Sequence, residues 1–312
     1  MKTRRQFLTT AAAGSASLAF SQSGIAEEKA PSNPKDGWID AHVHVWTPDT
    51  ERYPLAEGFA KEKMKPASFT PQELLAQCQP HGVSRIVLIQ MSFYRFDNAY
   101  MLDAMRDHPG VFSGVAIVDE NGEDVAATMK SLAERGVRGF RLYANRENAE
   151  SWAGSPGMKQ MWKTGAEEKL SMCCLSNADA LPAIRFQCEA FPETPVVIDH
   201  FSRIGTSGTI EQGDLDNLLR LAEFETVHVK LSAFYALGAK AAPYTDLGPM
   251  IRQLRDAYGA ERLMWATDCP YQVQEGHTYG DSVALIRDRL DFLSEEEKAS
   301  ILRKTAEKVF FS

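Results

Sequence analysis

The sequence predicts an α/β fold, a single (β/α)8 TIM barrel, and three observations carry this prediction. Short apolar runs alternate with helical segments from residue 38 almost to the C-terminus, and there are eight such runs. Several of the runs are apolar throughout, as expected for strands that are covered on both faces. No Gly-rich phosphate loop follows the first run, which disfavours the competing open, doubly wound sheet. A strict strand–helix alternation over roughly 270 residues is typical of the barrel.

The expected elements follow one another in order along the chain. Strands are expected at Trp38–Val45, Arg85–Gln90, Phe112–Val118, Val137–Tyr143, Leu170–Leu175, Pro195–His200, Val227–Ser232 and Arg262–Thr267. Helices are expected near Thr70–Gln79, Asn98–Asp107, Glu123–Arg135, Gly157–Glu168, Asp179–Phe191, Asp214–Phe224, Leu247–Tyr258, Asp281–Leu290 and Ser294–Val309. Thr70 and Ser294 are predicted N-caps, and Pro71 occupies the favoured first helical position. Residues 46–69 form a long irregular loop of the kind that often serves as a lid.

The first 26 residues predict an export signal that precedes the fold. The pair Arg4-Arg5 is followed by a weakly apolar run rich in Ala, Ser and Thr, which ends at Ala26. The paired arginines resemble a twin-arginine (Tat) signal, which a translocase reads. We therefore expect a signal peptide at 1–26, a polar linker at 27–36 and the barrel at 37–312. The protein is then expected in the periplasm, with the Tat translocase as its partner during export.

The composition narrows the classes of partner. The formal net charge is −8 and no basic block is present, which argues against nucleic acid and anionic membranes as ligands. A small-molecule substrate is expected, and the oligomeric state stays open. The cysteines are odd in number and form no Cys-x-x-Cys motif, so no disulfide framework is expected. They are Cys78, Cys173, Cys174, Cys188 and Cys269.

Side chains suited to chemistry gather at the carboxyl ends of the predicted strands, where barrel enzymes place their active sites. In the first strand, alternation predicts that Asp40, His42 and His44 share one face. The other strand ends carry Arg138, Arg141 and Tyr143, then His200, then Lys230 and Ser232 with Tyr235 beyond them, and finally Asp268. Histidines and a carboxylate that converge from several strands predict a site that holds a metal ion or polarises a substrate.

Four motifs in order resemble the amidohydrolase superfamily, and more narrowly its amidohydrolase-related group of sugar-lactonases and 2-pyrone-4,6-dicarboxylate hydrolases. They are Asp40-Ala41-His42-Val43-His44-Val45-Trp46, Val197-Ile198-Asp199-His200-Phe201, Lys230-Leu231-Ser232 and the segment from Arg262 to Pro270. The resemblance implies metal ligands or substrate-polarising groups at His42, His44 and His200. It also implies a general base at Asp268, which is a further candidate ligand.

Two departures from that superfamily limit the metal content. No lysine ends the fourth predicted strand and no histidine ends the fifth, so a two-metal centre is not expected. One divalent metal ion, with zinc as the first candidate, or a metal-free mechanism remains. After the seventh strand no arginine stands where the pyrone dicarboxylate hydrolases present one, which argues against a dicarboxylate substrate.

The predicted function is a hydrolase that opens a lactone or similar cyclic ester with an activated water. Asp268 is expected to act as general base, with His200 and Arg141 completing the catalytic set. The predicted substrate contacts are Arg138, Tyr143, Ser232 and Tyr235. Two alternatives stay open, namely a metal-dependent decarboxylase of the same superfamily and a catalytically silent barrel that binds a carbohydrate or another protein.

Overall fold

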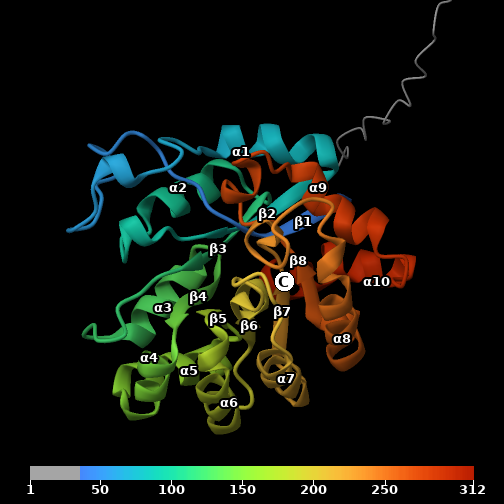
Figure 1. Cartoon of the computed structure of the whole chain (residues 1–312). Helices are drawn as coiled ribbons and strands as arrows, with labels where there is room; N and C mark the ends of the chain where they lie inside the picture. The colour runs from blue at the N-terminus through green and yellow to red at the C-terminus, as the bar shows by residue number, and fades with distance from the viewer. Residues whose placement is uncertain (1–35) are drawn as a thin grey trace, which may run out of the picture.

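Eight parallel strands form the barrel in the computed structural model, which describes residues 36–312 (Figure 1). Each strand pairs with the next one in sequence, in the order β1 to β8. Their bounds are β1 Trp38–Val43, β2 Val83–Ile89, β3 Phe112–Ala116, β4 Val137–Ala144, β5 Ser171–Ser176, β6 Val196–Ile198, β7 Val227–Leu231 and β8 Leu263–Trp265. Backbone hydrogen bonds of 2.9 Å from Asp268 to His42 and from His44 to Cys269 bring the two ends of the sheet together. The predicted barrel is confirmed.

Helices cover the outside of this barrel. Their bounds are α1 Pro71–Cys78, α2 Ala99–Asp107, α3 Val125–Glu134, α4 Arg146–Ser151, α5 Pro156–Glu168, α6 Leu181–Ala190, α7 Gln212–Arg220, α8 Gly248–Tyr258, α9 Tyr279–Ala284, α10 Glu295–Ala299 and α11 Thr305–Phe310. Thr70 and Ser294 are helix N-caps, as predicted, and each forms a capping box with the glutamate three residues later. The last predicted helix is α10 and α11, joined by a π-helical turn at Ser300–Lys304.

The structure bears on the predictions for the cysteines but not on those for the first residues of the chain. The predicted export signal and all of the linker but its last residue lie outside the described residues. Between residues 36 and 312, no helix has the length and apolar character needed to cross a membrane. All five cysteines are buried free thiols, which confirms that no disulfide framework holds this fold.

The C-terminal helix closes the amino-terminal end of the barrel. Ala306 and Phe310 of α11 pack against the inward-facing apolar side chains of the strands, and the C-terminus lies within the ring of strands in Figure 1. Near the start of β2, Arg85 forms a 2.8 Å ion pair with Glu307 of the same helix. Because this end is filled, only the carboxyl end of the barrel is left to receive a ligand.

A bulge in β1 changes the predicted faces of that strand. Its register against β2 shifts between Asp40 and Val43. Asp40 therefore lies outside the barrel, where it accepts hydrogen bonds from Thr267 at 2.5 and 2.9 Å and from Tyr279 at 2.7 Å. The prediction that Asp40 shares a face with the two histidines is wrong, because one extra residue in a strand reverses the alternation. Asp40 instead fastens β1 to the segment after β8.

A left-handed turn follows β6 and ends that strand earlier than predicted. His200, Phe201, Ser202 and Arg203 have φ values of 51°, 52°, 54° and 58°. For residues other than glycine this conformation costs roughly 1–2 kcal/mol each, so surrounding contacts must hold it. One such contact is buried, between Ser202 Oγ and Ser176 Oγ at 2.6 Å. The turn takes His200 out of the strand and aims its ring across the open end of the barrel.

Candidate active site

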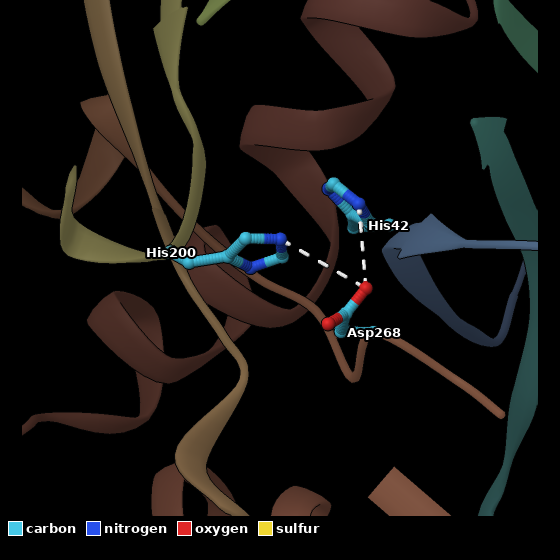
Figure 2. Close-up of side chains that lie close together, drawn as sticks. All are labelled: His42, His200 and Asp268. Carbon is cyan, nitrogen blue, oxygen red and sulfur yellow. Dashed lines mark ion pairs between the residues drawn. The ribbon is translucent and has the colours of Figure 1, made fainter. Parts of the chain in front are cut away.

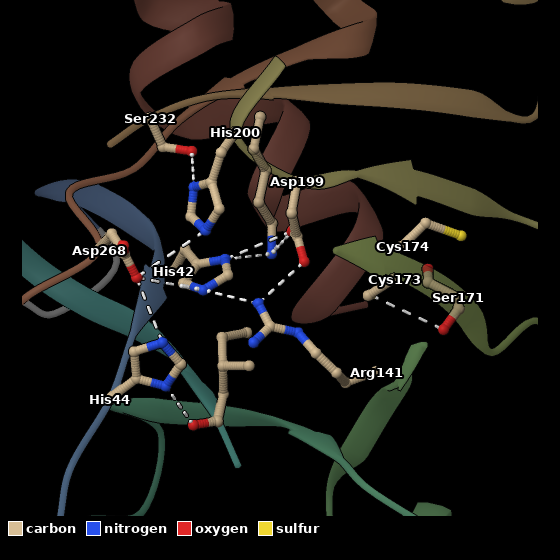
Figure 3. A network of polar contacts seen from close by, with 12 residues as sticks. His42, His44, Arg141, Ser171, Cys173, Cys174, Asp199, His200, Ser232 and Asp268 are labelled. Carbon is tan, nitrogen blue, oxygen red and sulfur yellow. Dashed lines mark hydrogen bonds and ion pairs between the residues drawn. The ribbon is translucent and has the colours of Figure 1, made fainter. Parts of the chain in front are cut away.

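One carboxylate lies at the centre of the open end, surrounded by imidazoles. The Nε2 atoms of His42, His44 and His200 lie 3.5, 3.2 and 3.8 Å from Oδ1 of Asp268. Figure 2 shows the rings of His42 and His200 turned toward this carboxylate, and Figure 3 adds His44. The other oxygen, Oδ2, accepts a 2.7 Å hydrogen bond from the hydroxyl of Tyr235. The structure thus brings together the residues predicted from strands one, six and eight.

Each imidazole is held in place through its second nitrogen. Nδ1 of His44 lies 2.9 Å from the carbonyl oxygen of Ile89, and Nδ1 of His200 lies 2.7 Å from Ser232 Oγ. Nδ1 of His42 lies 3.3 Å from Asp199 Oδ1. Such contacts fix the orientation of a ring and turn its Nε2 toward Asp268. Ser232, predicted to contact substrate, is fully buried and orients His200 instead.

A buried ionic layer lies beneath the imidazoles. Asp199 Oδ1 pairs with Lys230 Nζ at 3.0 Å, and Asp199 Oδ2 pairs with Arg141 Nη2 at 3.1 Å. Arg141 Nη2 also lies 3.0 Å from Nε2 of His42 (Figure 3). Burial by itself raises the pKa of Asp199, but the charge of Lys230 and its other partners outweigh burial and hold that pKa well below its usual value.

Sequence reasoning left Lys230 undecided and gave Asp199 no role. Lys230 is two residues before the inward-facing Ser232, so alternation in β7 already placed both on one face. Its side chain is fully buried, which requires a nearby anion. Asp199, which directly precedes His200 in its motif, was the residue in the sequence that could have been predicted as this anion.

The protonation states suit a neutral-pH active site. Burial lowers the pKa of His200 to about 4, although Asp268 and Asp199 oppose the shift. Burial, followed by the proximity of His200, lowers the pKa of His42 well below its usual value. Burial raises the pKa of Asp268, but the three neighbouring imidazoles outweigh it and hold that pKa below its usual value. At pH 7, His42 and His200 are therefore neutral and Asp268 is ionised.

Three of these groups could hold a metal ion. His42, His200 and Asp268 each offer a ligand atom, and these atoms lie within 4.8 Å of one another. Two neutral imidazoles and a carboxylate are the donors of mononuclear catalytic zinc sites, which keep one position open. His44, also predicted as a ligand, is not in this set and contacts Asp268 instead. The single lone pair on Nε2 of His42 can accept the Arg141 hydrogen bond or ligate an ion, but not both.

A cleft of about 790 Å³ opens above Asp268. Tyr143 and Tyr235 line it together with Arg141, as predicted for substrate contacts. Arg138 does not, and that prediction is wrong. Its guanidinium donates 3.0 Å hydrogen bonds to the carbonyls of Ala133 and Val137, at the opposite end of β4. Arg138 and Arg141 are three positions apart, and an odd spacing in a strand places two side chains on opposite faces.

With its (β/α)8 fold and its histidine–aspartate site, the chain belongs to the amidohydrolase family, whose model matches residues 39–311. It is 28% identical to a 4-sulfomuconolactone hydrolase of Rhizobium radiobacter, over 76% of this chain and 77% of that relative. It is also 28% identical to an L-fucono-1,5-lactonase of Burkholderia ambifaria, over 84% of this chain and 91% of the relative. The family predicted from the four motifs is confirmed.

A solved structure agrees with the barrel assignment. A Burkholderia multivorans amidohydrolase with bound zinc has a TM-score of 0.70, with 20% identity and coverage of 88% of this chain and 99% of that one. At this identity the likeness concerns the fold alone.

Proposed function

We propose that this protein hydrolyses a lactone, with Asp268 as the general base. The observation that carries the proposal is an ionised carboxylate at the floor of an open cleft, flanked by three imidazoles. Both curated relatives described above are named for hydrolysis of a lactone, which supports the same reaction class here. Their modest identity leaves the particular lactone open.

In the proposed reaction Asp268 accepts a proton from water as the water oxygen attacks the lactone carbonyl carbon. The bond between the carbonyl carbon and the ring oxygen then breaks, and the proton on Asp268 passes to the departing alkoxide. The product is an open-chain hydroxy acid. His44 is placed to share the transferred proton, because its Nε2 lies 3.2 Å from Asp268 while its Nδ1 is engaged with Ile89.

Arg141 is suited to bind the substrate's carbonyl or carboxylate oxygen. Its Nε is buried and has no hydrogen-bond partner among residues 36–312, although the side chain lines the cleft. A buried donor without a partner is unfavourable by roughly 1–3 kcal/mol. Because the guanidinium lines the cleft, its charge and its other N–H donors suit Arg141 to hold a substrate oxygen and orient the ring.

The proposal includes one divalent ion, with zinc as the first candidate, held by His42, His200 and Asp268. Such an ion lowers the pKa of bound water to about 7 and polarises a carbonyl. This matters here because a carboxylate with a depressed pKa is a weak base on its own. A metal-free mechanism is the second candidate, and the hydrogen bond between Arg141 and His42 favours it, since it occupies the nitrogen that the ion would need.

Two measurements test the proposal. A panel of lactones, with hydrolysis detected as acid release, tests the reaction, and elemental analysis of the purified protein tests the bound ion. We expect turnover of at least one lactone and about one bound divalent ion per chain. His42→Ala and His200→Ala should lose the ion, whereas the matched variant His44→Ala should retain it. Full activity without any ion selects the metal-free mechanism. Release of carbon dioxide from aromatic acids, or sugar binding without any turnover, would replace the lactonase proposal with a decarboxylase or a silent barrel.

We also propose export to the periplasm through the twin-arginine pathway, on the basis of Arg4-Arg5 and the run that follows. The double variant Arg4→Lys with Arg5→Lys should remain in the cytoplasm. Its appearance in the periplasm at the wild-type level would exclude this route.

A further inference from the structure

A second cleft, of about 830 Å³, adjoins the one above Asp268. The two clefts share Ser92, Arg141 and Tyr143 as lining residues, so they lie on either side of these side chains. Each has by itself the volume of a small-molecule site. Together they offer more room than a lactone ring without substituents would fill.

The wall of the second cleft carries most of the exposed large hydrophobic side chains of the described residues. Four large hydrophobic side chains are exposed among residues 36–312, and three of them line this cleft: Phe59 at 36%, Phe96 at 48% and Tyr143 at 42%. The fourth, Phe186 on α6, lines neither cleft. Exposed hydrophobic residues scattered singly need no explanation, but their gathering in one concavity marks a binding surface. The remaining apolar lining residues are Ile117, Val118, Leu142, Trp152 and Met158.

Much of the polar lining is already engaged within the protein. Asn148 donates a 2.8 Å hydrogen bond to the carbonyl of Tyr143, and Ser151 donates one of 2.6 Å to the carbonyl of Asn148. Ser155 accepts a hydrogen bond from the backbone of Met158 at the start of α5. These three groups cap or brace helices, whereas Arg95, Glu120 and Asn121 also line the cleft, so the exposed aromatic side chains form the apolar part of a mixed wall.

The boundary between the two clefts is built by neighbouring residues of β4. The guanidinium of Arg141 lies 5.7 Å from the ring centroid of Tyr143. A ligand held at Arg141 therefore has the carboxylate of Asp268 in one direction and the aromatic wall in the other. A single ligand could therefore place its polar reacting group beside Asp268 and an apolar substituent against the aromatic wall.

We infer that the second cleft is a subsite for an alkyl or aryl arm carried by the lactone. The inference rests on the proposed function and narrows its substrate class to lactones with an apolar substituent. Each methylene buried in such a subsite improves affinity by about fourfold. A five-carbon arm should therefore raise kcat/KM at least about tenfold, even when only part of it is covered.

The test compares δ-valerolactone with δ-decalactone, which has the same ring and an additional pentyl arm. Wild type should prefer δ-decalactone by at least about tenfold. Phe96→Ser should lose most of this preference through KM while hydrolysing δ-valerolactone normally. Phe186→Ser, which also removes an exposed phenylalanine, should match wild type on both. Equal efficiency of wild type on the two lactones, or the same loss in both variants, would overturn the subsite.

A binding measurement separates this inference from the proposed function. By titration calorimetry, wild type should bind 4-phenylbutyrate at least about tenfold more tightly than butyrate, and Phe96→Ser should not. If no lactone is hydrolysed but this aryl preference is found, lactone hydrolysis fails and the apolar subsite stands. If lactones are hydrolysed but neither arm improves binding or turnover, the subsite fails and the proposed function stands.

Discussion

The two ends of the barrel are built from the same eight strands but hold opposite kinds of side chain. The carboxyl end contains buried histidines and charged groups around Asp268, on a backbone with left-handed residues at His200 and Asp268. The amino end is filled by Phe310 and closed by the ion pair between Arg85 and Glu307. The difference indicates that one end supplies stability, which allows the other to maintain costly charges and strained backbone for chemistry.

The strongest test of this comparison replaces one carboxylate at each end. Asp268→Asn should lower kcat by about 10²–10⁴-fold and leave the urea midpoint nearly unchanged, since it removes the base but not the packing. A role for Asp268 as a helix cap predicts the reverse, and the short helical turn after it, Tyr271–Val273, shows no side-chain cap. Glu307→Gln is the matched variant and should keep kcat while losing about 1 kcal/mol of stability. A stable Asp268→Asn protein with normal kcat would remove Asp268 from the mechanism.

The next largest effect is expected at the filled end. Phe310 is 1% exposed, so Phe310→Ala should reduce the free energy of unfolding by about 3–5 kcal/mol. The kcat of the fraction that remains folded should stay close to wild type. Urea unfolding, with activity measured at low temperature, checks both. A large fall in kcat for fully folded protein would show that the two ends are coupled.

His228, near the start of β7, should make the stability of the amino end of the barrel depend on pH. Burial lowers its pKa from 6.5 to about 4, so the folded state favours the neutral ring. Its stabilising contribution is complete above pH 6.5 and is lost as the pH falls toward 4. Between pH 7 and pH 4.5 this loss should reach about 2 kcal/mol. Urea midpoints at both pH values should show a smaller decline for His228→Gln, and an equal decline in the two proteins would contradict the assignment.

The smallest effect is expected at Arg138, the arginine that the structure places away from the site. Arg138→Met should cost about 1 kcal/mol of stability, because it removes hydrogen bonds to Ala133 and Val137. Neither kcat nor KM should change. A raised KM for any lactone would return Arg138 to the substrate site and weaken the contrast with Arg141.

Local patterns in the sequence determined the order of the elements, the barrel and the family. The N-caps at Thr70 and Ser294 depend on residues only three positions away, so they are legible in the chain itself. Barrel topology brings all the carboxyl strand ends together, and this was enough to predict that His42, His44, His200 and Asp268 converge. The relatives confirm the predicted class of lactone hydrolase.

Tertiary contacts decided what surrounds those four residues. The bulge that turned Asp40 outward depends on its partners Thr267 and Tyr279, more than 200 positions away. The ionic layer joins Asp199 to Arg141 across 58 positions of the chain. A short segment cannot specify such partners, because the energy of a buried charge or a strained turn depends on neighbours that the fold alone assembles. The sequence by itself determined that His42, His44, His200 and Asp268 reach the open end of the barrel, and the assembled fold decided their orientation, their charge state and the aromatic wall of the cleft beside them.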